Sequence, residues 1–258
     1  AIQLFTLQNA HGLKATISTL GGTLTSLLVP DRSGQFGDVV LGFDKLEGYT
    51  NDLYLKENPY FGALIGRYGN RIATGKFTLN GQTYQLPINN APNSLHGGTI
   101  GYNRRVWQAT PGTSAAGPTL TLSYRSPDGE EGYPGALDVQ VVYTLTNADA
   151  LRLDYTATAD KATVLNLTNH SYFNLNHGHD QDILGHVLTL NADHHELMRR
   201  MHKPDLKVGP DDQDKRSVIP IEASDVDQWL AGTVEEAKQL LRLSPAEMFM
   251  AGPIDASI

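Results

Sequence analysis

The feature that most constrains the fold is a repeated pattern of short runs that alternate apolar and polar residues, each ended by turn residues. The stretch ATISTLGGTLTSLLVP alternates and then breaks at Gly21-Gly22 and at Pro30. Two further runs flank Asn80-Gly81 in GKFTLNGQTYQLP, and at least three more fill residues 119–159. Because side chains two apart share one face of a strand, the alternation indicates β-strands, and Asn-Gly indicates a tight hairpin.

Strands at this spacing continue to about residue 190 with almost no helical periodicity. Such a pattern predicts an antiparallel sandwich or barrel, and we expect an all-β fold built as a large antiparallel β-sandwich. A chain of 258 residues, 40% of them hydrophobic, is long enough to bury a sizeable core. We therefore expect one large domain, or one such domain with an appendage.

The pattern changes after about residue 195. SDVDQWLAG predicts a short helix from Ser224 to Gly232, and TVEEAKQLLRLSP predicts another, after a polar and irregular stretch. The sequence thus predicts a β-sandwich over residues 1–194 and an irregular, partly helical tail over residues 195–258.

Composition excludes several classes of function. The formal net charge is -8 and the pI is about 5.5, so nucleic acid is not the expected partner and a small molecule is. The basic tract Arg199, Arg200, His202, Lys203 and Lys207 reads as a solvated segment. The absence of cysteine excludes disulfides and thiolate chemistry, and it fits either the cytoplasm or the periplasm. No apolar run is long enough for a membrane span, so we expect no membrane partner; Ala1 in first place leaves a removed leader open.

Residues 163–175, TVLNLTNHSYFNL, place a histidine inside a predicted strand. The alternation assigns four apolar side chains to one face, namely Leu165, Leu167, Phe173 and Leu175. The opposite face carries Asn166, Thr168, His170, Tyr172 and Asn174. This polar face is either solvated or the floor of a binding site.

Three other stretches carry polar residues among apolar or glycine-rich neighbours. His96 precedes two glycines in NSLHGG, where the missing side chains let a ligand or another backbone approach. Asn70 and Arg71 lie in GRYGNRI, and such an arginine is either paired with a carboxylate or directed at a ligand. In SPDGEEGYPG we expect a turn in which Glu130 and Glu131 point to opposite sides, which disfavours a glycosidase pair.

No metal site is expected. His170, His177, His179, Asp180, His194 and His195 are close in sequence, but they lack the i, i+4 helical spacing that favours shared metal coordination. The chain also lacks a glycine-rich phosphate loop and a G-x-S-x-G element, which removes support for nucleotide chemistry and for a serine hydrolase.

Five motifs in this order, GDVVLGFD, GRYGNRI, NSLHGG, DGEEGYPG and LNLTNHSYFNL, resemble the aldose 1-epimerase (galactose mutarotase) family over about residues 1–194. The resemblance implies a large β-sandwich whose concave face binds a hexose such as galactose or glucose. It also implies interconversion of the α and β anomers without a cofactor.

By this resemblance His170 corresponds to the general acid that protonates the ring oxygen so that the pyranose opens. His96, Asn70, Arg71 and Tyr172 correspond to groups that contact sugar hydroxyls. A histidine suits the acid role because its ordinary pKa, about 6.5, lets it release and recover a proton near neutral pH.

The family's catalytic glutamate and a sugar-binding aspartate segment have no counterpart here. Glu196, Glu222 and Glu247 lie in unlike contexts, so the catalytic base is unassigned. We expect a sandwich incomplete at its C-terminal side and an impaired reaction, with a non-catalytic carbohydrate-binding remnant as the alternative. Residues 195–258 resemble the C-terminal part of SOS response-associated peptidases, with His195 the one candidate match to that family's functional histidine. The sequence thus suggests a chimera; the oligomeric state and the sugar preference stay open.

Overall fold

We analysed a computed structural model, which describes residues 1–176, 190–191 and 216–217. The chain separates into two compact units, residues 1–185 and 186–258. In the second unit the described residues form one antiparallel pair, β15 (Leu190–Asn191) with β16 (Arg216–Ser217). The helices predicted near Ser224 and Gly232, the basic tract and the other tail residues lie outside the described part.

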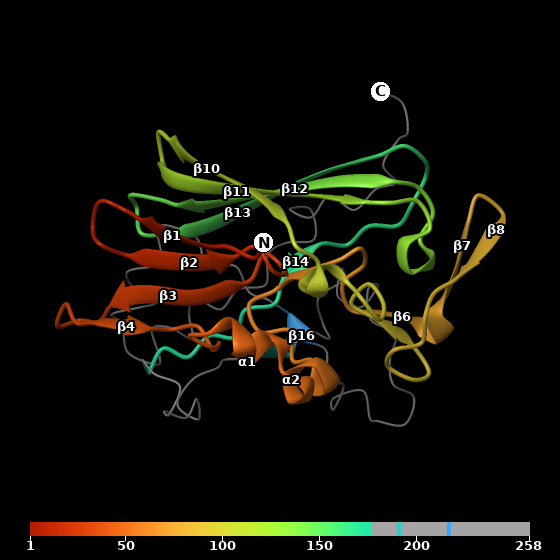
Figure 1. Ribbon diagram of the computed structural model, residues 1–258, viewed down its shortest axis with the longest axis horizontal. Helices are drawn as coiled ribbons and strands as arrows, with labels where there is room; N and C mark the ends of the chain where they lie inside the picture. The colour runs from red at the N-terminus through yellow and green to blue at the C-terminus, as the bar shows by residue number, and fades with distance from the viewer. Residues whose placement is uncertain (177–189, 192–215, 218–258) are drawn as a thin grey trace. The chain divides into compact units, whose positions relative to one another are not determined.

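Two four-stranded antiparallel sheets form the body of the first unit (Figure 1). One consists, in order, of β1 (Leu4–Gln8), β2 (Lys14–Ser18), β3 (Leu24–Pro30) and β4 (Phe36–Asp38). The other consists of β10 (Gln108–Ser114), β11 (Gly117–Ser126), β12 (Leu137–Leu145) and β13 (Leu151–Ala159). Each strand pairs with its sequence neighbour, as expected where turns are short.

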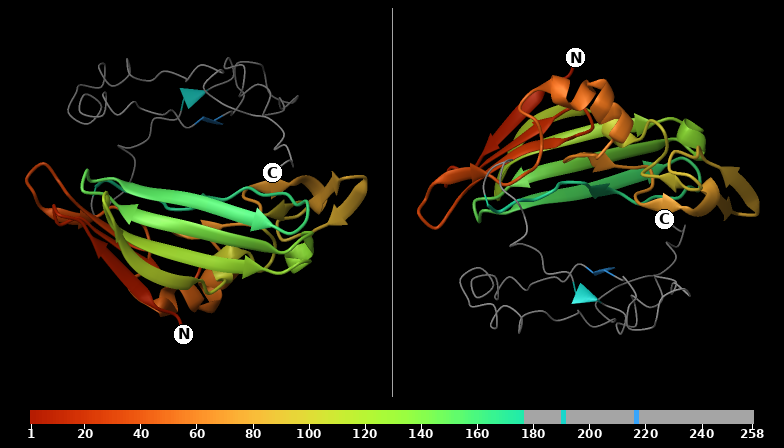
Figure 2. Two further views of the ribbon diagram at one scale, coloured as in Figure 1. Left: turned by 90° about the horizontal axis from the view of Figure 1, so that it is seen from above. Right: turned by 90° about the horizontal axis from the view of Figure 1, so that it is seen from below.

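The core lies between these sheets, which Figure 2 shows as two layers. It is built from the apolar positions of each alternating run, with Ala15, Ile17, Leu120, Leu122 and Tyr143 fully buried. Polar residues of β12 such as Asp138 and Gln140 alternate outward. The prediction of a β-sandwich is confirmed, because alternate apolar side chains of two facing sheets are buried in one core.

Shorter elements accompany the two sheets, most of them in the segment between β4 and β10. They are β5 (Leu64–Ile65), β6 (Arg71–Ile72), β7 (Lys76–Leu79), β8 (Gln82–Gln85), β9 (Ser94–Leu95), β14 (Thr168–Asn169) and three turns of 3-10 helix at Ala73–Gly75, Tyr102–Arg104 and Glu130–Gly132. The hairpin predicted at Asn80-Gly81 is confirmed, since Leu79 pairs with Gln82 across these two residues. Both have positive φ, +50° and +79°, as a tight two-residue turn needs.

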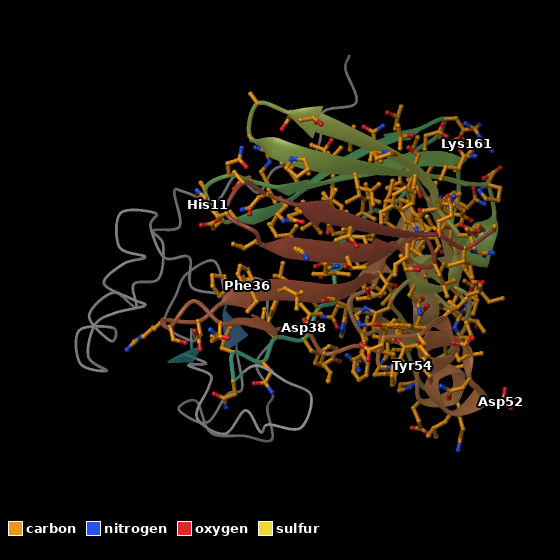
Figure 3. All side chains as sticks on the ribbon, turned by 60° about the vertical axis from the view of Figure 1, so that its left-hand side comes forward. His11, Phe36, Asp38, Asp52, Tyr54 and Lys161 are labelled. Atoms are coloured by element: carbon orange, nitrogen blue, oxygen red, sulfur yellow. The ribbon has the colours of Figure 1, made fainter. Side chains whose placement is uncertain are left out.

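Two short helices, α1 (Leu46–Thr50) and α2 (Asp52–Glu57), were not predicted from the sequence. The side chain of Asn51 caps α2 by accepting a hydrogen bond from the Tyr54 N–H at 2.9 Å. Figure 3 shows α2, which carries Asp52 and Tyr54, at the end of the β1–β4 sheet opposite to His11. Among the described residues, no helix has the length and apolar character needed to cross a lipid bilayer.

The continuous strand predicted for residues 163–175 is wrong. Only Thr168–Asn169 forms a strand, and isolated bridges at Asn166 and Phe173 flank it. The cause is local, because the Asn169 side-chain oxygen accepts hydrogen bonds from the N–H and the hydroxyl of Ser171 and bends the chain there. The predicted apolar face is also wrong in part: Leu167 packs against the core, but Leu165, Phe173 and Leu175 are exposed.

The turn predicted in SPDGEEGYPG is confirmed, and its two glutamates face different partners. Glu130 accepts hydrogen bonds from Tyr124 and Ser126 and pairs with Arg105 at 2.8 Å. Glu131 accepts a hydrogen bond from the backbone N–H of Thr99 at 2.7 Å. Both carboxylates therefore stabilise the turn, and they point to different sides, as expected from the sequence.

Arg67 is a structural residue that the sequence analysis did not single out, although it lies in GRYGNRI. Its side chain is 2% exposed, and its guanidinium donates to the carbonyl oxygens of Pro134 and Gly135 at 2.9 and 2.7 Å. It also donates to the Ser126 hydroxyl at 2.6 Å. A buried guanidinium is stable only with such acceptors, so Arg67 ties β5 to the turn before β12.

Candidate functional site

The pairing of β6 with β9 brings two of the motifs together. Arg71 lies opposite Leu95, so Asn70 and His96 face each other at the end of this short ladder. The His96 N–H donates to the Asn70 carbonyl oxygen at 2.9 Å, and the Asn70 N–H donates to Nδ1 of the His96 ring at 2.9 Å. Residues 26 positions apart are thus fixed as immediate neighbours.

His170 reaches the same place through the pairing of β14 with β5. Its N–H donates to the Ala63 carbonyl oxygen at 2.8 Å, and its own carbonyl oxygen accepts from Gly62 at 3.1 Å. The Asn169 side chain holds this segment further, donating to Gly62 at 2.9 Å and to the Tyr143 hydroxyl at 3.3 Å. The position of His170 is therefore fixed by hydrogen bonds of this segment to Gly62, Ala63 and the buried Tyr143.

The ring of His170 is the centre of an aromatic cluster. Its centroid lies 5.1 Å from that of His96 and 5.2 Å from that of Tyr172. Tyr60 completes the cluster, with its centroid 4.8 Å from His96 and 5.6 Å from His170. Three of the predicted residues, His96, His170 and Tyr172, are thus brought together by contact, and Asn70 joins them through His96.

Tyr60 is a site residue that sequence reasoning missed. It lies in ENPYFG, which reads as a loop, and no alternation marks it. In the structure it is buried and has a φ of +60°, an uncommon backbone conformation for a bulky residue. Its ring packs beside both histidines because β5, which follows it, pairs with β14, so the local sequence carried no signal for it.

Arg71 is not paired with a carboxylate in the described residues, which was one of the two alternatives that the sequence left open. Its Nε donates to the Asn90 side chain at 3.0 Å and its Nη1 to the Asn70 side chain at 3.4 Å. No ion pair joins it to an acid within the described residues. Its exposed guanidinium therefore keeps donors available beside His96.

The two glycines after His96 admit a backbone. At Gly97, whose φ is +91°, an added Cβ would lie 1.8 Å from the Gly66 carbonyl oxygen. Of the two possibilities left open by NSLHGG, close approach of another chain segment is what the structure contains at this position.

Burial sets the charge state of both histidines. The pKa of His96 is lowered from 6.5 to about 4, chiefly by burial and to a smaller extent by repulsion from the nearby His170 and Arg71. Burial also lowers the pKa of His170 below its ordinary value. Near neutral pH both rings are mainly uncharged, and His170 is the one more readily protonated.

Two cavities of the first unit lie away from this cluster. One of about 590 Å³ lies on the polar outer face of β10–β13, between residues such as Gln108 and Thr158. Another of about 290 Å³ lies where α1 covers the outer face of β1–β3. Neither is lined by His96 or His170.

The metal candidates of the sequence are mostly outside the described part, namely His177, His179, Asp180, His194 and His195. Among the residues that the structure describes, no three histidine, cysteine, aspartate or glutamate side chains gather in a way that would hold a metal ion. Glu196, Glu222 and Glu247 also lie outside that part.

Comparison with known proteins identifies relatives over most of the chain. Galactose mutarotase from Bos taurus is 50% identical over 192 residues, which are 74% of this chain and 53% of the bovine protein. An aldose epimerase homologue from C. elegans matches with a TM-score of 0.60 and 34% identity over 68% of this chain and 51% of that one. Galactose 1-epimerase from Lactobacillus acidophilus matches with a TM-score of 0.59 and 28% identity, covering 68% of this chain and 53% of its own.

This chain spans about half the length of the curated relatives that it matches. The model of one family, described as aldose 1-epimerase, matches residues 3–218, beyond the boundary expected at residue 194. With a sandwich of the same architecture and a family match over most of its length, the chain belongs to the aldose 1-epimerase family.

Proposed function

We propose that this protein interconverts the α and β anomers of hexoses such as galactose and glucose, without a cofactor. The observation that carries the proposal is the convergence of His96 and His170, with ring centroids 5.1 Å apart, beside Tyr172 and Arg71. The names of its relatives, galactose mutarotase and galactose 1-epimerase, give the substrate class.

In this reaction His170 transfers a proton to the ring oxygen of the pyranose. The bond between C1 and the ring oxygen breaks, the hydroxyl at C1 passes its proton to solvent water, and C1 becomes a carbonyl carbon. Rotation about the C1–C2 bond and reclosure from the other face give the second anomer, and each proton returns. Protonated His170 suits this step, because a lowered pKa makes it a stronger acid, although the protonated fraction near neutral pH is small.

The other residues bind the sugar. Arg71 and the amide of Asn70 offer donors to hydroxyl oxygens, and Tyr172, which is 42% exposed, offers a ring and a hydroxyl. The acceptor of the C1 hydroxyl proton is unassigned among the chain's residues. Because a positioned base contributes about 10²–10⁴-fold, we expect turnover to be slower by that factor than with a complete set.

The experiment is anomer exchange of D-galactose, followed by NMR, on the full chain and on two histidine variants. His170→Gln removes the proposed acid. His11→Gln is the matched control, because His11 lies in the β1–β2 turn and pairs with Asp149 at 3.0 Å. We expect the first variant to lose about 10²–10⁴-fold and the control to keep the rate. A folded wild-type chain that leaves the buffer rate unchanged would refute the proposal.

The alternative is a carbohydrate-binding remnant without turnover, for which the donors of the exposed Arg71 and the exposed ring of Tyr172 would be enough. Calorimetric titration with galactose separates the two, since the remnant predicts binding heat without rate enhancement. Absence of both effects removes both candidates.

We also propose that the sandwich ends near residue 194 and that residues 195–258 come from a different family, as their resemblance to SOS response-associated peptidases suggests. The alignment with the bovine relative, which covers 74% of this chain, supports a change of origin near residue 194. The match of the family model to residues 3–218 counts against so early a junction and favours one near residue 218. Sequencing genomic DNA of the source across codons 190–220 tests this. A reading frame that continues into the relatives' second half would overturn it.

A further inference from the structure

The ladder between β6 and β9 contains an exchange that bears on how His96 acts. In an antiparallel pair, two hydrogen-bonded residues normally exchange two N–H to carbonyl bonds. Asn70 and His96 make one of them, from the His96 N–H to the Asn70 carbonyl oxygen at 2.9 Å. The second is replaced, because the Asn70 N–H donates to Nδ1 of the imidazole at 2.9 Å.

The backbone at this point explains the replacement. Asn70 and His96 both have positive φ, +62° and +51°, a region in which asparagine and histidine are enriched among residues other than glycine. The His96 carbonyl oxygen lies at Gly101 instead, where an added Cβ would approach it to 2.6 Å. The imidazole thus takes the place in the ladder that this carbonyl leaves.

We propose that the Asn70 peptide fixes His96 in the neutral tautomer with the proton on Nε2, so that His96 binds sugar as a hydrogen-bond donor and takes no part in proton transfer. A backbone N–H can only donate, so Nδ1 must keep its lone pair. A ring flipped by 180° would place a C–H against that N–H, and an imidazolium would place a second donor there. Both leave the Asn70 N–H without an acceptor.

The surroundings of the ring favour the same state. His96 is wedged edge-on against Tyr60 and His170, with interplanar angles of 76° and 82°, which restricts rotation of the ring. No described residue accepts a hydrogen bond from Nε2, so this N–H is available to a ligand oxygen. Asn70 is thus a positioning residue that acts through its main chain, and proton transfer is left to His170. The ligand part of this inference rests on the proposed function.

The test is a long-range ¹H–¹⁵N correlation spectrum of the full chain with labelled histidine at neutral pH. His96 is assigned by the signal that disappears in His96→Asn. We expect two unlike ring nitrogens for His96, a proton-free Nδ1 and a protonated Nε2, unchanged as the pH falls to about 5. A proton on Nδ1, or an averaged pattern of two tautomers, would overturn the inference.

A matched variant separates the peptide from the side chain. Asn70→Gly keeps the backbone N–H and accepts positive φ, so we expect the His96 pattern to be retained. Loss of the pattern in a folded variant would assign the tautomer to the Asn70 side chain and overturn the main-chain role.

Adding D-galactose to the same sample tests the ligand part. We expect the Nε2–H signal of His96 to shift and that of His11 to stay. His96→Asn keeps an acceptor for the Asn70 N–H but loses the Nε2 donor, and we expect galactose to bind about tenfold more weakly. An Nε2–H that is present but insensitive to galactose, in a chain that accelerates anomer exchange, would overturn the donor role and leave the proposed function standing. If His96 shows the Nε2–H tautomer in a chain that neither binds nor converts galactose, the tautomer assignment stands and the proposed function is overturned.

Discussion

The substitution Tyr143→Phe tests whether the core of the sandwich positions His170. Tyr143 is fully buried on β12, and its hydroxyl donates to the Gly22 carbonyl oxygen at 2.8 Å. The same hydroxyl accepts from the Asn169 side chain at 3.3 Å, one residue before His170. One oxygen atom therefore joins both sheets to the segment that carries the proposed acid.

The magnitude follows from the groups that lose a partner. Without the hydroxyl, the buried Gly22 carbonyl keeps no donor in the described part of the chain, which costs about 1–3 kcal/mol. The Asn169 side chain still donates to the Gly62 carbonyl oxygen at 2.9 Å, so losing its second hydrogen bond, to the Tyr143 hydroxyl, adds little to this cost. For a unit of this size each kcal/mol lowers Tm by about 2–4 °C, so we expect a decrease of about 2–12 °C.

A thermal scan followed by tryptophan fluorescence measures this decrease in Tm in a Trp229→Phe background, where Trp107, 2% exposed in the core, is the reporter. Tyr155→Phe is the control, because its hydroxyl makes no hydrogen bond in the described residues and its removal should change stability by about 0.5 kcal/mol or less. Equal effects of the two substitutions would refute the reasoning.

Three further outcomes are expected. The pKa of His96 is lower in the fold, about 4, than the ordinary 6.5, so the unfolded chain binds the proton first. The free energy of unfolding therefore decreases as the pH falls from about 6.5 toward 4. The urea midpoint should fall less steeply over this pH range in His96→Asn than in the unsubstituted chain. Arg67→Lys should cost about 1–3 kcal/mol for each buried acceptor left unpaired, whereas Arg125→Lys, at an exposed ion pair, should change stability by less than about 1 kcal/mol in the same thermal scan. Tyr60→Ala removes a ring that buries both histidines and should raise both histidine pKa values, as an NMR titration would measure, whereas Tyr60→Phe should leave them unchanged.

The sheets of the sandwich were predictable because each strand carries its own signal. Alternation in residues 119–159 and the Asn80-Gly81 turn are local properties of the chain. Burial on facing sheets then follows from the side-chain period alone.

The irregular parts of the site were not predictable in this way. The bend at Ser171 depends on where the Asn169 side chain points, which competes with the ladder and breaks the strand expected there. The placement of Tyr60 depends on a pairing more than 100 residues away in sequence. The resemblance supplied His170, His96, Asn70, Arg71 and Tyr172 as candidates, and their sugar-binding and acid roles stay predictions.

The pairing of β5 with β14 also has a consequence for the order of folding. The Asn169 side chain bonds to Gly62 across 107 residues, and His96 meets His170 only when this bond and the β6–β9 ladder have both formed. Closing so long a loop is slow compared with forming the local hairpins. During synthesis the two imidazoles can therefore meet only after residue 170 has left the ribosome, which makes their contact a late marker of folding of the first unit.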